Sequence, residues 1–525
     1  MNDIKVLDCT LRDGGYVNKW DFGFKCIVKI LKNLNNAKID YAEIGFLKDC
    51  EYDKEKSVFN EIKEIENILP EESLYSKTVA MIVFGQFSKS KLVPKTPDIK
   101  LDSIRVTFKK HEIKDVFSYF KKIKDCGYEV FVNPTNIETY SDSELLDLIE
   151  KVNKLKPYGF SIVDTNGVLK ERNLQRLYYL IDNNLDEDIA LCFHSHNNLQ
   201  LSFSNAQCLM KVNRNRQLII DSTIFGMGRG AGNLCTELLT EYINDNYDGN
   251  YDIIPILKII DEQINPIFAN TPWGYSVPYY LAAKNHCHPN YAKYLVEKQT
   301  VPVEVINNLL KLVPNNKKSL YDTNLIRQIY LDNFSHKIDD TDTVKYLKET
   351  LEGKDLLVIA PGKTLMQEQE KIDNYIKSEN PFIISLNFDP ENYSQDLVFI
   401  TNLKRFSSIE NNDKPLVVTS NIESIPQNAK LLNYSSYLNN SRMFDNTALM
   451  LLKLLGKIGV KKVTFAGLDG FNTKTTENYI SNEFVNNGKE GEEFDERNQI
   501  MSEELQKFAK KIDIKFLTKS QYTIN

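Results

Sequence analysis

The stretch Ile189-Ala190-Leu191-Cys192-Phe193-His194-Ser195-His196-Asn197-Asn198 is the most telling segment of this chain. Its first five residues form a short apolar run that predicts a buried strand. Residues two apart on a strand point to the same face, so His194 and His196 would present two imidazoles side by side where the strand ends. The chain has only 6 histidines in 525 residues. Two of them at one strand exit favour a divalent transition-metal site over a chance pair of surface histidines.

Seven further apolar runs of strand length lie within the first 230 residues. They are Lys5–Asp8, Tyr41–Phe46, Thr78–Phe84, Ser103–Phe108, Glu129–Asn133, Phe160–Asp164 and Gln217–Thr223. Amphipathic segments lie between several of them, at Phe24–Leu34, Val116–Asp125, Asp142–Leu155 and Leu199–Val212. Strands that are apolar on both faces are typical of parallel sheets covered by helices. Eight βα units in this length predict a TIM (β/α)8 barrel, with a doubly wound open sheet as the alternative.

Polar side chains also follow the first strand, in Asp8-Cys9-Thr10-Leu11-Arg12-Asp13-Gly14-Gly15. Barrel active sites lie at the C-terminal ends of the strands, so this segment should meet the two histidines on one rim. Asp13 would supply a hard oxygen ligand, and Arg12, expected on the open rim, would stabilise a developing anion. A surface Arg–Asp pair on a glycine-closed turn is the alternative. Four more polar residues at strand ends are rim candidates: Glu43, Lys109, Asn133 and Asp164.

The loop after the eighth strand, Gly226-Met227-Gly228-Arg229-Gly230-Ala231-Gly232-Asn233, has glycine at every second position. Glycine lets a backbone approach a ligand closely, and this part of a barrel often binds phosphate or carboxylate. A tight turn that closes the barrel explains the same glycines, and both interpretations stay open. Asn233 lies at the start of a helix, which it would cap.

Length, net charge and cysteine content limit the class of protein to which this chain can belong. The length of 525 residues indicates more than one domain. The net charge of -7 and the pI near 5.7 give no indication of nucleic-acid binding. The chain has no stretch of about 20 apolar residues, so we expect no membrane span. The first residues do not resemble a signal sequence, so we expect a cytoplasmic location. The eight cysteines are scattered without a C-x-x-C pair, which is typical of reduced thiols.

All of the cysteines precede residue 290, which indicates a boundary in the chain. We expect a barrel over residues 1–240, a helical extension over 241–350 and a Rossmann-like α/β domain over 351–525. The strands expected in this last domain are Leu356–Ala360, Phe382–Leu386, Leu397–Thr401, Leu416–Ser420, Val463–Ala466 and Ile514–Leu517, with helices at Asn446–Leu455 and Glu503–Lys511. The turn Ala360-Pro361-Gly362-Lys363-Thr364 would suit an anion, Asp469 would add a carboxylate, and Lys474–Arg497 would form a loop or lid.

Together these motifs resemble the DRE-TIM metallolyases, a superfamily that includes HMG-CoA lyase-like enzymes. The resemblance rests on residues 8–14, 194–201 and 228–233, and residues 198–201 are most similar to the 4-hydroxy-2-oxovalerate aldolase branch. It implies that Asp13, His194 and His196 bind Mn2+ or Mg2+, with Asn233 as a further ligand. It also implies that Arg12 stabilises the enolate oxygen of a substrate.

The chain departs from that branch at one position, because Tyr16 stands where the aldolases have a histidine base. Tyrosine has an ordinary pKa near ~10, so it is a poor base at neutral pH but can donate a proton. The C-terminal domain is a second departure. It resembles Rossmann-like domains of surface-polysaccharide pathways, which implies a nucleotide or nucleotide-sugar ligand.

The resulting hypothesis is a metal-dependent aldolase. It would make or break a C–C bond through the enolate of a pyruvate-like 2-oxo acid, with an aldehyde that is sugar-derived in surface-glycan biosynthesis. Two alternatives remain: an acyl-CoA condensing synthase, and a catalytically lapsed scaffold that binds a nucleotide-sugar or a partner protein. No nucleic-acid or membrane partner is expected, and a homo-oligomer is left open.

Overall fold

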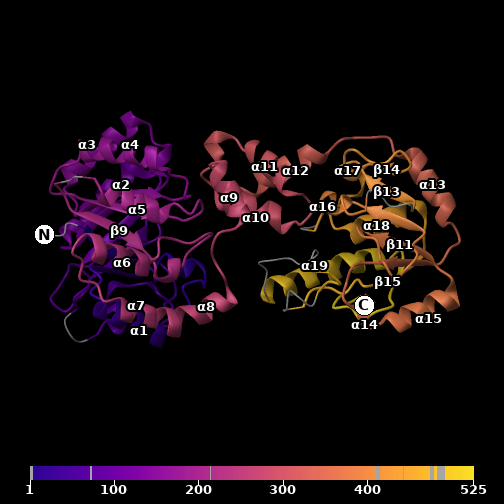
Figure 1. Ribbon diagram of the computed structural model, residues 1–525, viewed down its shortest axis with the longest axis horizontal. Helices are drawn as coiled ribbons and strands as arrows, with labels where there is room; N and C mark the ends of the chain where they lie inside the picture. Colours follow the sequence, from indigo (N-terminus) through magenta and orange to yellow (C-terminus); the bar gives the residue numbers. More distant parts are fainter. Residues whose placement is uncertain are drawn as a thin grey trace. The chain divides into compact units, whose positions relative to one another are not determined.

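The computed structural model describes residues 4–70, 74–212, 215–409, 414–440, 443–472, 478–481 and 491–524. The chain forms two compact units (Figure 1). The first comprises residues 1–292 and 315–321, and the second comprises residues 293–314 and 322–525. The helices expected between residues 241 and 350 therefore divide between the two units. The domain limits at residues 240 and 350 remain a proposal.

The first unit is a closed barrel of parallel strands, as predicted. Its eight strands are β1 (Ile4–Asp8), β2 (Tyr41–Leu47), β4 (Lys77–Val83), β5 (Ser103–Phe108), β6 (Glu129–Pro134), β7 (Gly159–Asp164), β8 (Ala190–Ser195) and β9 (Leu218–Ser222). Each strand pairs in parallel with the next, and β1 closes the barrel by pairing with both β9 and β2. The two-residue strand β3 (Val58–Phe59), which the sequence did not indicate, pairs with β2 outside this ring.

Amphipathic helices surround these strands (Figure 1). They are α1 (Phe24–Asn36), α2 (Ile113–Asp125), α3 (Asp142–Leu155), α4 (Glu171–Asp182), α5 (Ser202–Met210) and α6 (Thr236–Asn246). The first unit also contains α7 (Ile253–Ile259), α8 (Asn265–Asn270) and α9 (Val277–Lys284), which follow the barrel in the sequence. Short 3-10 turns, η2 (Ile62–Ile68) and η3 (Lys89–Lys91), follow β2 and β4 where a regular barrel would have α-helices.

The barrel interior changes from apolar to charged along the strands. The apolar layer is a separate buried cluster made of Leu7, Cys9, Tyr41, Val79, Phe131, Ala190, Cys192 and Ile219. Side chains two residues further along a strand point to the same side, one level closer to the C-terminal rim. On β2, β8 and β9 these next residues are Glu43, His194 and Asp221, all buried. The apolar layer is therefore followed by a charged layer at the C-terminal ends of the strands, where barrels have their active sites.

The second unit contains a seven-stranded parallel sheet in the order β14-β13-β12-β11-β10-β15-β16. Its strands are β10 (Leu356–Ile359), β11 (Phe382–Leu386), β12 (Leu397–Ile400), β13 (Leu416–Thr419), β14 (Lys430–Leu432), β15 (Lys462–Ala466) and β16 (Asp513–Phe516). Its helices include α11 (Val303–Lys311), α12 (Thr323–Phe334), α13 (Thr341–Leu351), α14 (Thr364–Gln367), α15 (Gln369–Glu379), α16 (Leu403–Phe406), α17 (Tyr434–Tyr437), α18 (Thr447–Ile458) and α19 (Gly491–Ala509), and α10 (Pro289–Glu297) begins before it. This is the predicted Rossmann-like architecture, with β14 as the strand that the sequence did not indicate.

Three further expectations can be compared with the structure. The loop expected over Lys474–Arg497 lies partly outside the described residues, and its end belongs to α19. All eight cysteines are free thiols. Among the described helices, none combines the length and the apolar character needed to cross a membrane.

Candidate metal centre

The ends of β1 and β8 bring Asp13, His194 and His196 together. All three side chains are buried, and one potential ligand atom from each lies within 4.8 Å of the others. Asn233 joins them, because its Nδ2 donates a hydrogen bond of 2.6 Å to Oδ2 of Asp13 and its backbone pairs with that of His196. The four residues predicted to hold a metal therefore meet at one place, although they come from three distant segments of the chain.

The state of these donors fits a divalent cation. Nδ1 of His196 and Oδ1 of Asn233 are buried without a hydrogen-bond partner among the described residues. Burial lowers the pKa of His196 to about 3, so its imidazole is neutral, as a metal ligand must be. Burial alone would raise the pKa of Asp13, but Arg12 and the imidazoles hold it well below its usual range. An ionised carboxylate beside buried imidazoles matches the preferences of Mn2+ and similar ions.

A second group of potential ligands, Cys9, His194 and Asp221, shares one histidine with the first. Burial raises the pKa of Cys9 well above its usual range, so this residue stays a thiol rather than the thiolate that binds metals. Its Sγ donates to the carbonyl oxygen of Ser222. Asp221 is already engaged by Arg105 at 2.7 Å. The set built on Asp13 is therefore the better metal site.

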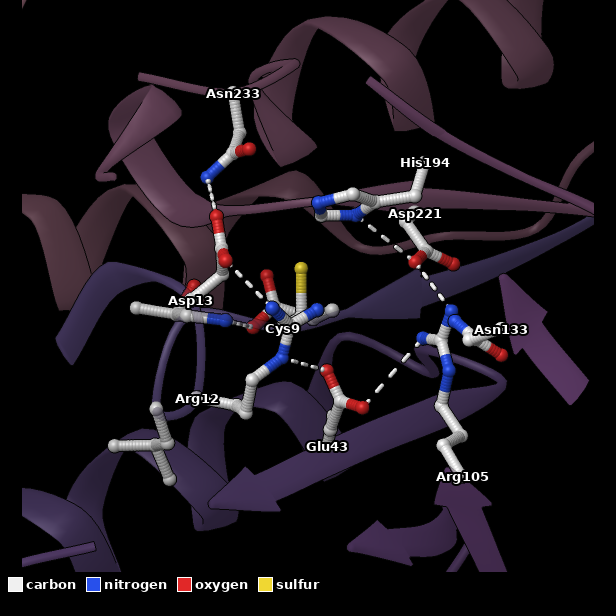
Figure 2. A network of polar contacts seen from close by, with 12 residues as sticks. Cys9, Arg12, Asp13, Glu43, Arg105, Asn133, His194, Asp221 and Asn233 are labelled. Atoms are coloured by element: carbon white, nitrogen blue, oxygen red, sulfur yellow. Dashed lines mark hydrogen bonds and ion pairs between the residues drawn. The ribbon is translucent and has the colours of Figure 1, made fainter. Parts of the chain in front are cut away.

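A buried chain of alternating charges supports the centre (Figure 2). Nε of Arg12 donates to Glu43 at 2.7 Å, and its Nη1 donates to Asp13 at 2.5 Å. On the other side of Glu43, Nη1 of Arg105 lies 3.6 Å from its carboxylate. Nη2 of Arg105 holds Asp221, whose carboxylate lies 3.1 Å from Nδ1 of His194. This contact leaves Nε2 of His194 for a metal and fixes the ring, as carboxylates behind metal-binding histidines do.

Arg12 is not on the open rim, and this corrects the expectation from the sequence. Its side chain is only 7% exposed. Besides its two carboxylate partners, the backbone carbonyl of Arg12 accepts a hydrogen bond of 2.7 Å from Nε1 of Trp20. The segment after β1 therefore folds back so that Trp20 contacts the backbone of Arg12. A surface Arg–Asp pair, the alternative interpretation, is therefore wrong.

Tyr16 is the last residue of the 3-10 turn η1 (Gly14–Tyr16), which directly follows Asp13 in the sequence. Its ring packs edge-on against Trp20 and Phe46, and the guanidinium of Arg229 lies 5.6 Å from its centre. The side chain is 43% exposed, and its hydroxyl makes no hydrogen bond within the described part of the chain. Partial burial and the carboxylate of Asp13 raise the pKa of Tyr16. The hydroxyl is therefore protonated at neutral pH and is a donor, not a base.

The other rim candidates have different surroundings. Glu43 is central to the charge chain, and Asn133 lies beside Arg105 (Figure 2). The carboxylate of Asp164 accepts hydrogen bonds from the backbone of Val168 and Leu169, so it organises its own loop. Lys109 is exposed at the start of the 3-10 turn η4 (Lys110–Glu112).

Sequence reasoning missed Arg105 and Asp221, which are fully buried inside the barrel. Each of them is a charged residue within an otherwise apolar strand, at a position whose side chain faces the barrel interior. This pattern could have indicated a buried role.

Contacts within the loop explain the glycines after β9. A Cβ on Gly228 would lie 2.2 Å from Nδ2 of Asn233. A Cβ on Gly232, where φ is +82°, would lie 2.1 Å from the carbonyl oxygen of Gly226. The glycines let this loop fold tightly enough to deliver Asn233 to Asp13, which supports the turn interpretation.

Asp221→Asn should weaken metal binding by about 10–100-fold, because the carboxylate that fixes His194 is lost. It should also lower the free energy of unfolding by about 3–5 kcal/mol, since Arg105 loses its closest buried partner. Calorimetric Mn2+ titration and denaturant melts measure the two effects. Asp142→Asn is the matched control, because its ion pair with Arg176 is exposed and should contribute at most about 1 kcal/mol. Wild-type Mn2+ affinity in Asp221→Asn would contradict the supporting role.

The N-terminal half of the chain is similar to several known proteins. A family model described as HMGL-like matches residues 3–259. A 4-hydroxy-2-oxovalerate aldolase of Bacillus cereus (strain ATCC 10987 / NRS 248) is 22% identical over 276 residues, which cover 50% of this chain and 76% of that protein. An oxaloacetate decarboxylase of Mycobacterium tuberculosis is 21% identical over 280 residues, covering 52% and 79%. The crystal structure of the HMG-CoA lyase from Brucella melitensis aligns with a TM-score of 0.41 at 12% identity, covering 49% of this chain and 95% of that one.

Proposed function

We propose that residues 3–259, which match the HMGL-like family model, form a metal-dependent carbon–carbon lyase of the aldolase type. The observation that carries the proposal is the meeting of Asp13, His194 and His196 beside the buried Arg12. Relatives named 4-hydroxy-2-oxovalerate aldolase and oxaloacetate decarboxylase support the same class of reaction. The preferred substrate is a pyruvate-like 2-oxo acid, with an aldehyde as the second reactant.

In this proposal Asp13, His194 and His196 hold the ion, and the free Oδ1 of Asn233 is a further ligand. A bound Mn2+ or Mg2+ would polarise the keto group of the 2-oxo acid. Arg12 keeps its charge under all working conditions and stabilises the negative charge that develops on the enolate oxygen. Glu43 holds the guanidinium in position through Nε, so little reorganisation is needed during the reaction. Tyr16 donates a proton at the aldehyde-derived oxygen.

The experiment that tests the proposal combines metal content with enolate formation. Wild-type protein loaded with Mn2+ should contain one ion per chain and should exchange deuterium into the methyl group of pyruvate. His194→Ala should lose both, because an imidazole ligand is removed. His111→Ala, which removes a 71% exposed histidine, is the matched control and should keep both. Equal metal content in His194→Ala and wild type would refute the site.

The proposal extends to the second reactant, the biological role and the cellular location. We propose an aldehyde derived from a sugar, a role in surface-glycan biosynthesis and action in the cytoplasm. The C-terminal domain would take a nucleotide or nucleotide-sugar. Incubation with pyruvate and a panel of aldehydes, analysed by mass spectrometry, should yield a hydroxy-oxo acid product. An acyl-CoA condensing synthase would instead release free CoA from acetyl-CoA, and a lapsed scaffold would give neither product.

A further inference from the structure

A further arginine, Arg229, lies near the metal centre but takes no part in the buried chain of charges. It belongs to the loop between β9 and Asn233, and its backbone carbonyl accepts a hydrogen bond of 3.2 Å from the N–H of Gly232. The loop that delivers Asn233 to Asp13 therefore also carries Arg229. It follows the eighth strand of the barrel, at the end where barrels bind their substrates.

Contacts on two sides hold this part of the loop in place. The carbonyl oxygen of Gly230 accepts a hydrogen bond of 3.4 Å from the N–H of Gly274. A Cβ on Gly230, where φ is +72°, would lie 3.0 Å from Oδ1 of Asn198 and 3.6 Å from the ring of Tyr279. The backbone next to Arg229 is therefore fixed by packing, as the support of a ligand-binding side chain should be.

The guanidinium of Arg229 has no anionic partner. Arg12 and Arg105 each contact buried carboxylates, but the side chain of Arg229 forms no hydrogen bond or ion pair with any residue that the structure describes. It is half-buried and lies over the ring of Tyr16, 5.6 Å from the ring centre. A guanidinium over an aromatic ring keeps the N–H groups at its edge available for an anion.

The charge of Arg229 acts on both a metal ligand and the proposed proton donor. Burial is the main cause of the lowered pKa of His196, and Arg229 lowers this pKa further. Burial raises the pKa of Tyr16, and Arg229 opposes that rise. The carboxylate of Asp13 also acts on Tyr16, but its two oxygens already accept hydrogen bonds from Arg12 and Asn233. A positive charge without a carboxylate of its own therefore lies beside the site.

The other neighbours of Arg229 add positive charge. Burial and the charge of Arg229 lower the pKa of His288 to about 4. Burial also lowers the pKa of His286, and Lys318 and Lys170 lower it further. Lys170 directly precedes α4, Lys318 belongs to the segment 315–321 of the same unit, and neither forms an ion pair within the described part of the chain. Such surroundings attract an anionic ligand.

From these contacts we infer that Arg229 binds an anionic group, a carboxylate or a phosphate, on the aldehyde reactant, at the end remote from its carbonyl carbon. The hydroxyl of Tyr16 holds the aldehyde oxygen, and the guanidinium over the same ring holds the charged end. The 2-oxo acid does not need this arginine, because the metal centre and Arg12 bind its own polar atoms. The inference rests on the proposed lyase function and names the chemical class of its second reactant.

Rates of aldol addition of pyruvate to two matched pairs of aldehydes test the inference. The full chain is loaded with Mn2+ and saturated with pyruvate. Glyceraldehyde 3-phosphate is compared with glyceraldehyde, and succinic semialdehyde with butanal. At least one anionic aldehyde should have a higher kcat/KM than its neutral counterpart. Arg229→Gln should lower this kcat/KM by about 10–100-fold, the value of a charged hydrogen bond, chiefly by raising KM. The values for the neutral aldehydes should not change.

Arg176→Gln is the matched control, because it removes an exposed arginine of the same unit that pairs with Asp142. Its kinetics should equal those of wild type with all four aldehydes. Added salt provides a measurement that needs no variant. The KM of wild type for the anionic aldehyde should rise with ionic strength, and the KM for its neutral counterpart should not.

The preferred aldehyde identifies the anionic group, since glyceraldehyde 3-phosphate carries a phosphate and succinic semialdehyde a carboxylate. Equal kcat/KM within both pairs, or an equal loss for charged and neutral aldehydes in Arg229→Gln, overturns the inference. If a melt shows that Arg229→Gln is unfolded, Arg229→Lys replaces it, and the KM of the anionic aldehyde should rise because lysine lacks the planar fork. Deuterium exchange into pyruvate without aldehyde should be unchanged in these variants. Absence of exchange in wild type would instead refute the proposed lyase.

Discussion

Arg12→Lys should lower the rate of deuterium exchange into the methyl group of pyruvate by about 10²–10³-fold, the usual effect of losing one donor to a developing oxyanion. Lysine keeps one positive charge between Asp13 and Glu43, so the fold should survive. It lacks the planar fork with which Arg12 contacts both carboxylates at once, at 2.5 Å and 2.7 Å. The geometry of the cation, rather than its charge, is therefore what this variant removes. Exchange is followed by NMR with Mn2+-loaded protein, and melting curves report the fold.

Arg12→Ala should also destabilise the fold, because the buried carboxylates of Asp13 and Glu43 lose the arginine that they share. A fall of about 3–5 kcal/mol in the free energy of unfolding is expected. Arg176→Lys alters an exposed arginine and should leave both measurements unchanged. Wild-type exchange in Arg12→Lys would mean that this arginine only balances charge.

Tyr16→Phe should reduce the rate of aldol addition by roughly 10²–10⁴-fold, the usual contribution of a general acid or base. The ring contacts with Trp20 and Phe46 remain, so only the hydroxyl is removed. That hydroxyl is protonated, partly exposed and without a hydrogen-bond partner within the described residues, as a proton donor to a substrate should be. Because the donor acts on the aldehyde-derived oxygen, deuterium exchange into pyruvate should stay at the wild-type rate.

This difference between turnover and exchange distinguishes proton donation from packing. A loss of both activities would mean that Tyr16 shapes the site, and full turnover would assign the proton to another group, a bound water first. Tyr179→Phe is the control, because it removes the hydroxyl of a tyrosine that is 50% exposed on α4. Metal content should be the same in all three proteins.

The barrel, and the meeting of Asp13, His194 and His196 at one end of it, could be predicted because their signals are local. The apolar run before His194 indicates a strand, and barrel geometry then requires His194, His196 and Asp13 to lie on one rim. The burial of Arg12 could not be predicted, because it depends on contacts with Glu43 and with the segment that carries Trp20. The strands β3 and β14 are two and three residues long, too short to produce a periodic pattern.

Arg105 and Asp221, which support the site, were harder to find because each acts through its contact with the other. Arg105 and Asp221 lie 116 positions apart, and each looks like an isolated charge in an apolar strand. A single sequence does not reveal that they meet, although each occupies an inward position of its strand.

The chain of alternating charges has a consequence for electroneutrality. It contains three carboxylates, those of Asp13, Glu43 and Asp221, against the two guanidinium groups of Arg12 and Arg105, with the imidazole of His196 neutral. Its formal charge is one negative unit. A divalent cation would turn this into one positive unit, and a single carboxylate on the substrate would bring it to zero. A buried cluster is least costly when neutral. The charge of this buried cluster therefore complements a divalent cation together with one carboxylate group.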